Sequence, residues 1–201
     1  MSAVSGLHCP ATVLLARHGE AAYEATTWSG EGGSLTLTGR AQAAALADRL
    51  HGRRVLHVYC STMARAVQTA EIAAAKLGVG VTTRIGLQEF SFGSFAQDED
   101  NPVTKTFARW LDGNDLAARV DGGESGEEVV ERANAVLAEI ADAHSGETVL
   151  VVAHGGILSL AIRNLLTFES GVRPQRFANC AYAETELRSD GWRLTGWSDP
   201  E

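Results

Sequence analysis

The chain has 201 residues, of which 45% are hydrophobic and 21% are charged, a balance typical of soluble globular proteins. Its formal net charge of −8 disfavours nucleic acid and anionic membrane surfaces as partners, because both repel an acidic protein. We find no secretory signal in Met1–Pro10 and no apolar run near the ~20 residues that cross a bilayer. Cys9, Cys60 and Cys180 are an odd number without metal-ligand spacing, which predicts free thiols and a cytoplasmic location. We expect one domain, residues 1–201.

The first predicted strand, Thr12–Ala16, is a short apolar run that leads into Arg17-His18-Gly19-Glu20. A loop rich in Gly, Ser and Thr follows as far as Thr38. Alanines and leucines then recur at helical spacing, which predicts a helix from Gly39 to about Leu50.

The second predicted strand, Val55–Cys60, leads directly into a second helix. Ser61 or Thr62 offers a side-chain oxygen that can cap the start of this helix. We expect the helix to run to Leu77, where Gly78 supplies a left-handed stop.

A third strand is predicted at Val79–Thr83, before the least regular part of the chain. Within this part, helical spacing predicts one helix near Thr104–Leu111. Residues 90–121 are expected to form a lid.

A capping box starts the next helix, because Ser125 and Glu128 can each accept a hydrogen bond from a backbone amide there. This helix is predicted to run to about Ala143. Thr148–Ala153 is the most apolar of the predicted strands, and it ends in His154-Gly155-Gly156.

The last part of the chain is predicted as a helix to Leu166 and an antiparallel hairpin. Its two strands are expected near Ala178–Leu187 and Gly191–Trp197, joined by Ser189-Asp190 at a sheet edge. The whole pattern predicts an α/β three-layer sandwich with a mostly parallel central sheet, an antiparallel edge strand and helices on both faces.

Two histidines share an unusual setting, because His18 and His154 each follow an apolar strand and precede glycine. Ligands of open α/β sheets bind at the carboxyl ends of parallel strands, where both imidazoles are expected. Either histidine alone could simply close its strand. Arg17 adjoins the first imidazole, and Arg65 lies in the first turn of its helix, where guanidinium groups and a helix N-terminus favour phosphate. An alternative for Arg65 is a surface ion pair with Glu71 or with a neighbouring loop carboxylate.

Phosphoryl transfer to water needs an in-line nucleophile, compensation of a dianion and a proton for the leaving oxygen. A neutral imidazole can be that nucleophile at neutral pH. Glu89 is the best candidate acid, because its apolar neighbours can raise its pKa. Spacing alone does not separate it from Glu20, Glu24 or Glu31.

Five ordered segments resemble the motifs of the histidine phosphatase superfamily, the phosphoglycerate-mutase-like group. The resemblance spans most of the chain, and we place the chain in its phosphatase branch. The segments are Arg17 to Glu20, Leu35 to Ala43, Ser61 to Thr69, Leu87 to Glu89 and Ala153 to Gly155.

The resemblance implies that His18 becomes phosphorylated, and that Arg17, Arg65 and His154 hold the phosphoryl oxygens. Glu89 would protonate the leaving group and then activate water. No metal and no cofactor are implied, since two fixed cations would repel a bound dication.

The sequence departs from the family pattern after the first motif. Family members often carry Thr and Asn where this chain has Ala21 and Glu24, and we expect Glu24 to be displaced from the phosphate. Ser29-Gly30 could serve instead. Glu124 resembles a position near substrate in relatives, but it is not assigned to the site.

The lid favours hydrolysis over mutase chemistry. Residues 90–121 carry six acidic and three basic side chains, whereas mutases resemble one another in a long insertion with basic residues that grip a carboxylate.

Aromatic residues could form a wall for the organic part of a phosphate ester, although core packing is the stronger interpretation; they are Trp28, Phe90, Phe92, Phe95 and Trp110.

The predicted function is therefore hydrolysis of small-molecule phosphate monoesters through a phosphohistidine. The alternatives are mutase-type phosphoryl transfer, a noncatalytic phospholigand-binding protein and a metal-dependent hydrolase that uses His18 and His154. The residues argue against a noncatalytic protein, which would be expected to lose His18 or Glu89. The sequence leaves the physiological ester and the oligomeric state undetermined.

Overall fold

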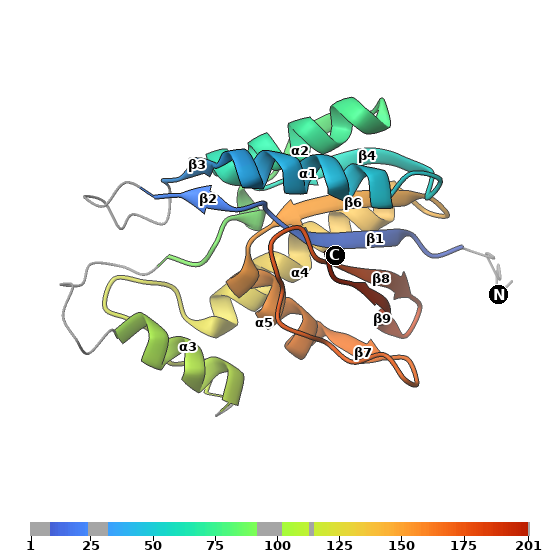
Figure 1. Ribbon diagram of the computed structural model, residues 1–201. Coiled ribbons are helices and arrows are strands. Elements are labelled where there is room, and N and C mark those ends of the chain that lie inside the picture. Colours follow the sequence, from blue (N-terminus) through green and yellow to red (C-terminus); the bar gives the residue numbers. More distant parts are fainter. Residues whose placement is uncertain (1–8, 24–31, 92–101, 113–114, 201) are drawn as a thin grey trace, which may run out of the picture.

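A seven-stranded mixed sheet forms the middle layer of the molecule (Figure 1). The computed structural model describes residues 9–23, 32–91, 102–112 and 115–200. In spatial order the strands are β5 (Gly80–Thr83), β4 (Val55–Cys60), β6 (Thr148–Ala153), β1 (Thr12–Arg17), β8 (Tyr182–Arg188), β9 (Gly191–Ser198) and β7 (Leu166–Phe168). Two further short strands, β2 (Ala21–Ala22) and β3 (Ser34–Leu35), pair with each other.

The four neighbouring strands β5, β4, β6 and β1 are parallel, so their carboxyl ends lie on one side of the sheet. In the register, Arg17 lies opposite Ala153, and Cys60 lies opposite Val152. The residues that follow these strand ends, His18, His154 and Ser61, therefore come together. This carboxyl edge is where α/β sheets place their ligands.

Helices cover both faces of the sheet, which confirms the predicted three-layer α/β class. One face carries α1 (Leu37–Arg49) and α2 (Ala64–Leu77). The other carries α4 (Gly126–Ala143) and α5 (Gly155–Leu165), with α3 (Pro102–Asp112) packed beside α5. Among the described residues, none of the helices is long and apolar enough to cross a membrane.

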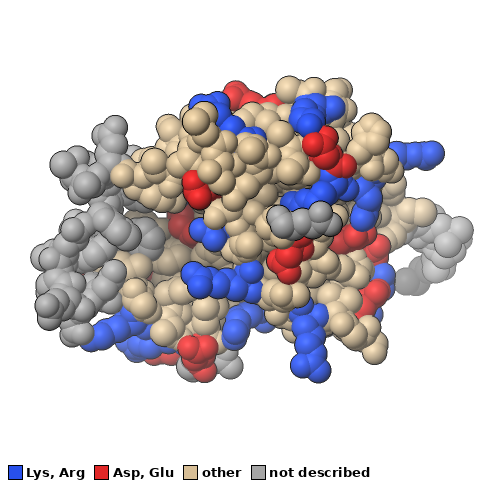
Figure 2. Space-filling view, in the orientation of Figure 1, with Lys and Arg blue, Asp and Glu red and all other residues tan. Residues whose placement is uncertain are grey.

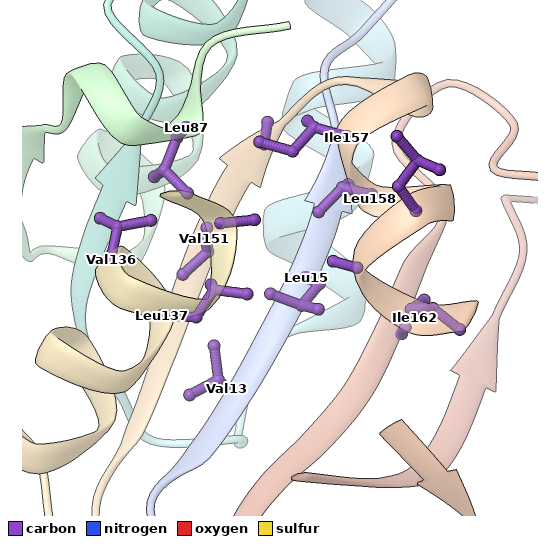
Figure 3. Close-up of a cluster of buried hydrophobic side chains, with 14 of the residues drawn as sticks. Val13, Leu15, Leu87, Val136, Leu137, Val151, Ile157, Leu158 and Ile162 are labelled. Atoms are coloured by element: carbon purple, nitrogen blue, oxygen red, sulfur yellow. The ribbon is translucent and has the colours of Figure 1, made fainter. Parts of the chain in front are cut away.

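Burial on both faces explains why the central strands read as continuous apolar runs. On β1, Val13 and Leu15 belong to the core under α4 and α5, whereas Leu14 belongs to the core under α1 and α2. Figure 3 shows the first of these cores, where Leu137 of α4 and Ile162 of α5 lie over the sheet.

The hairpin of β8 and β9 is confirmed, but its predicted place at the sheet edge is wrong. The antiparallel strand β8 lies between β1 and β9, and the short strand β7 pairs in parallel with β9 outside it. The predicted helix ends at Leu165, and the chain then extends along β9 as β7. Three residues of strand are too few to show a period in the sequence.

Two helix starts test the capping predictions. Ser125 Oγ accepts from Glu128 N and Glu128 Oε2 accepts from Ser125 N, which confirms the capping box. The cap predicted for α2 is wrong, because Met63 is its N-cap and no side chain caps it. Gly78 ends α2 in the left-handed conformation as predicted.

Candidate active site

His18 stands at the carboxyl end of β1 and is only 3% exposed. Its amide donates to Ala153 O of β6, and its carbonyl accepts from Asn179 Nδ2 at 3.0 Å. The next residue must be glycine, because a Cβ on Gly19 would lie 2.5 Å from Gly39 O at the start of α1. The backbone of the first motif is therefore packed against α1.

The hydrogen bonds of the His18 ring define its tautomer. Nδ1 lies 2.7 Å from the Gly19 carbonyl, which can only accept, so Nδ1 carries the proton. Nε2 then has a free lone pair, and it accepts from Arg65 Nε at 3.3 Å. Burial, together with the charges of Arg65 and Arg17, lowers the pKa of His18 to about 3, although the bond to Gly19 opposes this. The ring is thus neutral at physiological pH, with Nε2 available as a nucleophile.

Arg65 lies in the first turn of α2 and is 4% exposed. Its guanidinium contacts His18 and donates to the Gly32 carbonyl at 2.6 Å. Burial lowers the pKa of Arg65, which nevertheless stays charged. The alternative of a surface ion pair with Glu71 is wrong, because Arg65 is turned into the protein.

Arg17 is the last residue of β1, and its NH1 group donates to the Phe177 carbonyl at 2.9 Å. Its Nε is buried without a hydrogen-bond partner among the described residues. A Cβ on Gly155 would lie 3.4 Å from that Nε, so Arg17 reaches the start of α5. An unpaired buried donor on a permanent cation is suited to an anion.

His154 is the N-cap residue of α5, and it is fully buried. Its ring lies edge-on to that of His18, with centroids 5.2 Å apart. Nε2 lies 2.8 Å from Ser61 Oγ, while Nδ1 is buried without a described partner. Burial is the main cause of a pKa well below the ordinary value, so the ring is neutral.

Ser61 is the hydrogen-bond partner of the His154 ring, and the direction of this bond sets the tautomer of His154. Its Oγ already accepts from Met63 N at 3.2 Å, and no other described acceptor is bonded to its hydroxyl. If the hydroxyl donates its single proton to His154 Nε2, the ring proton lies on Nδ1. Nδ1–H is then a second buried donor, beside Arg17 Nε, that can bind an anion.

Glu89 is partly buried, and its carboxyl group lies at the N-terminus of α5, the helix that begins at Gly155 directly after His154. Oε2 accepts from Gly156 N at 2.9 Å, and Oε1 accepts from Ile157 N at 2.8 Å and from Phe90 N at 3.2 Å. Burial raises the pKa of Glu89, while the three amides and the Arg65 charge oppose it. Burial and the hydrogen bonds to this carboxyl group thus act on its pKa in opposite directions, and burial is the larger effect.

The sequence matches the histidine phosphatase superfamily (branch 1) over residues 13–200. The chain belongs to this superfamily. It is 29% identical to "Probable phosphoglycerate mutase GpmB" of Salmonella typhi over 196 residues, 92% of this chain and 89% of that protein. No narrower activity follows from that similarity alone.

Solved structures with the same architecture as this chain include the following two. The mycobacterial glucosyl-3-phosphoglycerate phosphatase matches with a TM-score of 0.76 and 23% identity, over 94% of this chain and 99% of that chain. YhfR of Bacillus stearothermophilus matches with a TM-score of 0.76 and 25% identity, over 95% of this chain and 98% of that chain.

The fold of this superfamily member brings together all five residues that the sequence singled out. His18, Arg65 and Arg17 meet His154 at the carboxyl edge of the sheet, and Glu89 joins them through the amides of α5. Glu20 is exposed and accepts from Thr36 Oγ1 at 2.6 Å, whereas Glu89 interacts electrostatically with Arg65 of this arrangement. The roles of these residues stay predictions.

The aromatic wall is not supported by the described aromatics. Phe90 and Trp110 are 6% and 3% exposed, and their rings pack edge-on at 4.9 Å in the core. Other suggested site residues lie outside the described residues; they are Glu24, Trp28, Ser29-Gly30, Glu31, Phe92 and Phe95.

Sequence reasoning missed the supporting residues. Ser61 was expected to cap α2, but it holds His154, and Thr69 Oγ1 accepts from Gly19 N at 3.0 Å. Both residues belong to the third of the five family-like segments, Ser61 to Thr69. Their place in that segment was the available signal for a role at the site. Within the described part of the chain, no three His, Cys, Asp or Glu side chains are grouped so as to hold a metal ion.

Proposed function

We propose that this superfamily member is a phosphatase that hydrolyses small-molecule phosphate monoesters through phosphohistidine at His18. The observation that carries the proposal is the neutral His18 ring, with its proton on Nδ1 and its Nε2 beside Arg65. Nε2 attacks phosphorus, the bond to the ester oxygen breaks, and water later releases the phosphoryl group as phosphate.

The phosphoryl oxygens bind to cationic and neutral donors that meet at the carboxyl edge of the sheet. Arg17 Nε and His154 Nδ1 are buried without described partners, and Arg65 lies against the nucleophile. A dianion would satisfy the buried donors and gain from two guanidinium charges. These groups also stabilise the charge on the oxygens as the phosphoryl group moves.

Glu89 supplies the proton to the leaving oxygen and then takes one from the attacking water. A bound dianion adds negative charge near the carboxyl group, so its pKa, already raised by burial, should rise further. This favours the protonated form at the moment when an acid is needed. The mechanism uses no metal and no other cofactor, and it fits a cytoplasmic enzyme whose three cysteines are free.

Mutase-type transfer is the second candidate, because the curated relative in Salmonella typhi is named a phosphoglycerate mutase. Phosphatase action is favoured by the charges of the predicted lid. Arg109 pairs with Asp115, and Arg119 pairs with Glu128 at 3.0 Å. These two arginines are thus already engaged with carboxylates of the protein.

The test is release of phosphate from p-nitrophenyl phosphate and from a panel of metabolite monoesters, with and without chelator. The parent is compared with His18→Ala and Glu89→Gln, and an acid-labile phosphoryl adduct is sought in rapidly quenched samples. We expect turnover that chelator leaves unchanged and that His18→Ala abolishes. Turnover retained in His18→Ala would contradict the assigned nucleophile. Rapid interconversion of phosphoglycerates without phosphate release would establish the mutase alternative.

A further inference from the structure

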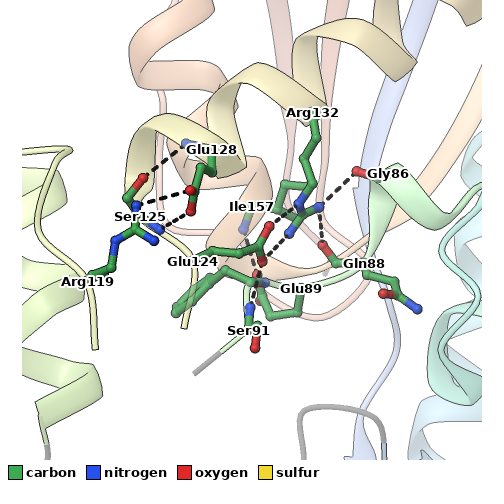
Figure 4. Close-up of polar contacts among 11 residues, drawn as sticks. Gly86, Gln88, Glu89, Ser91, Arg119, Glu124, Ser125, Glu128, Arg132 and Ile157 are labelled. Carbon is green, nitrogen blue, oxygen red and sulfur yellow. Dashed lines mark hydrogen bonds and ion pairs between the residues drawn. The ribbon is translucent and has the colours of Figure 1, made fainter. Parts of the chain in front are cut away.

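A bidentate ion pair joins Arg132 of α4 to Glu124, two residues before that helix begins, beside the segment that carries Glu89 (Figure 4). Arg132 Nε donates to Glu124 Oε1 at 2.6 Å, and its NH2 group donates to Glu124 Oε2 at 3.0 Å. The Arg132 and Glu124 side chains are 23% and 25% exposed, so the pair is substantially shielded from water. Such fork-to-fork pairs fix orientation as well as charge.

The pair holds the backbone on both sides of Glu89. Arg132 NH1 donates to the Gly86 carbonyl at 2.9 Å and to the Gln88 carbonyl at 2.8 Å. On the other side, Glu124 Oε2 accepts from Ser91 N at 2.8 Å. Figure 4 shows these contacts converging around Glu89, although neither member of the pair touches its carboxyl group.

Packing adds to this restraint. A Cβ on Gly86 would lie 3.2 Å from Val136 Cβ, so the backbone before Glu89 runs close against α4. Leu87 and Phe90, the buried residues on either side, are 1% and 6% exposed. Packing and the contacts of the ion pair therefore restrain this segment together.

We infer that Arg132 and Glu124 are positioning residues for the general acid Glu89, an inference that rests on the proposed function. They keep the carboxyl group where the amides of α5 and the leaving oxygen of the ester both reach it. Loosening the segment would misplace the proton donor while leaving His18, Arg17, Arg65 and His154 in position. A displacement of about 1 Å can cost a factor of about 100 in rate.

Leaving-group dependence distinguishes positioning of an acid from general damage. An alkyl phosphate needs a proton on its departing oxygen, whereas p-nitrophenolate leaves well without one. We therefore compare kcat/KM for both esters in the parent, Arg132→Gln and Glu124→Gln. Arg84→Gln is the matched control, since Arg84 also joins this region to α4, through Glu139 at 3.0 Å, but touches neither carbonyl.

We expect the alkyl ester to lose at least about ten-fold more kcat/KM than the p-nitrophenyl ester in both variants of the pair. Inhibition by inorganic phosphate should stay within about two-fold of the parent in Glu124→Gln, because this variant keeps the phosphoryl-binding side chains and also the Arg132 charge that acts on His154. Arg84→Gln should reduce both esters equally and little.

Thermal unfolding identifies any variant that fails to fold, and Glu124→Gln, which keeps its shape, then provides the comparison. The inference would be overturned if a folded variant of the pair lost kcat/KM equally for the two esters, or lost none. In that case turnover by the parent would still support the proposed function. A parent inactive toward both esters would overturn the proposed function and this inference together.

Discussion

The Nε–H group of Arg65 donates to His18 Nε2 across 3.3 Å. This contact occupies the same lone pair that the proposed reaction uses, so the bond must break when phosphorus approaches. Arg65 Nε–H can then donate instead to an oxygen of the phosphoryl group, because the phosphorus that carries this oxygen bonds to His18 Nε2. In the proposed reaction, one planar group would thus orient the resting nucleophile and stabilise the transferred group.

Replacing Arg65 with lysine should therefore lower kcat/KM by about 100-fold or more, because an ammonium group cannot serve both purposes in this geometry. Steady-state hydrolysis of p-nitrophenyl phosphate measures the loss. Arg40→Lys, at an exposed position of α1, is the control and should retain the parent's activity. Equal rates for Arg65→Lys and the parent would contradict the phosphoryl-binding role.

Removing the Ser61 hydroxyl should change the proportion of the two tautomers of the His154 ring. In Ser61→Ala, Nε2 loses its donor, and the population with a proton on Nδ1 should fall. Nitrogen chemical shifts of the imidazole report the tautomer directly, and inhibition by phosphate should weaken in parallel. Ser61→Thr keeps a hydroxyl and should restore both readouts. An unchanged nitrogen spectrum in Ser61→Ala would exclude this role.

Stability should depend on pH through His18. Its pKa is about 3 in the folded protein and near 6.5 when unfolded, so the unfolded chain binds more protons between these values. The free energy of unfolding contributed by this group is complete above pH 6.5. It falls as pH decreases toward 3, by up to about 1.4 kcal/mol per pH unit.

Urea unfolding of the parent and of His18→Gln at several pH values tests this sign. Subtracting the two curves removes the contribution of the other titrating groups. The parent should lose stability relative to His18→Gln as pH falls from 6.5. A constant difference across this range would show that the folded state does not depress the His18 pKa.

Adding a methyl group at Gly156 should displace Glu89. A Cβ there would lie 2.3 Å from Phe90 Cε1 and 2.7 Å from Glu89 Oε1. We expect Gly156→Ala to destabilise the protein by about 1–3 kcal/mol and to lower activity more for alkyl than for p-nitrophenyl phosphates. Thermal unfolding and kcat/KM measure the two effects. Gly52→Ala is the control, because a Cβ at Gly52 would meet no atom within 4 Å and only the positive φ of this residue disfavours alanine.

Strand ends, motif order and helix stops were accessible to sequence reasoning because they depend on local patterns. Val55–Cys60 and Thr148–Ala153 were predicted with their observed bounds, and apolar runs buried on both faces explain this success. The two-residue strands β2 and β3 were missed because they are too short to show a period.

The parts of the site that sequence could not supply depend on tertiary contacts. Glu124 precedes the capping box, and its local sequence gave no reason to pair it with Arg132 or with Ser91. The tautomer of His154 likewise depends on Ser61, which lies 93 positions away in the chain. Such relationships appear only when the strands are placed side by side.

The N-terminus of α5 carries two tasks at once, since His154 caps the helix and its first amides hold Glu89. In the proposed reaction, one ligand of the phosphoryl group and the proton donor would therefore both be held in place by the first turn of a single helix. Their spacing would then depend on that turn more than on the rest of the chain. Substitutions farther out, where the ester's organic part would rest, can then alter substrate preference without disturbing the chemistry.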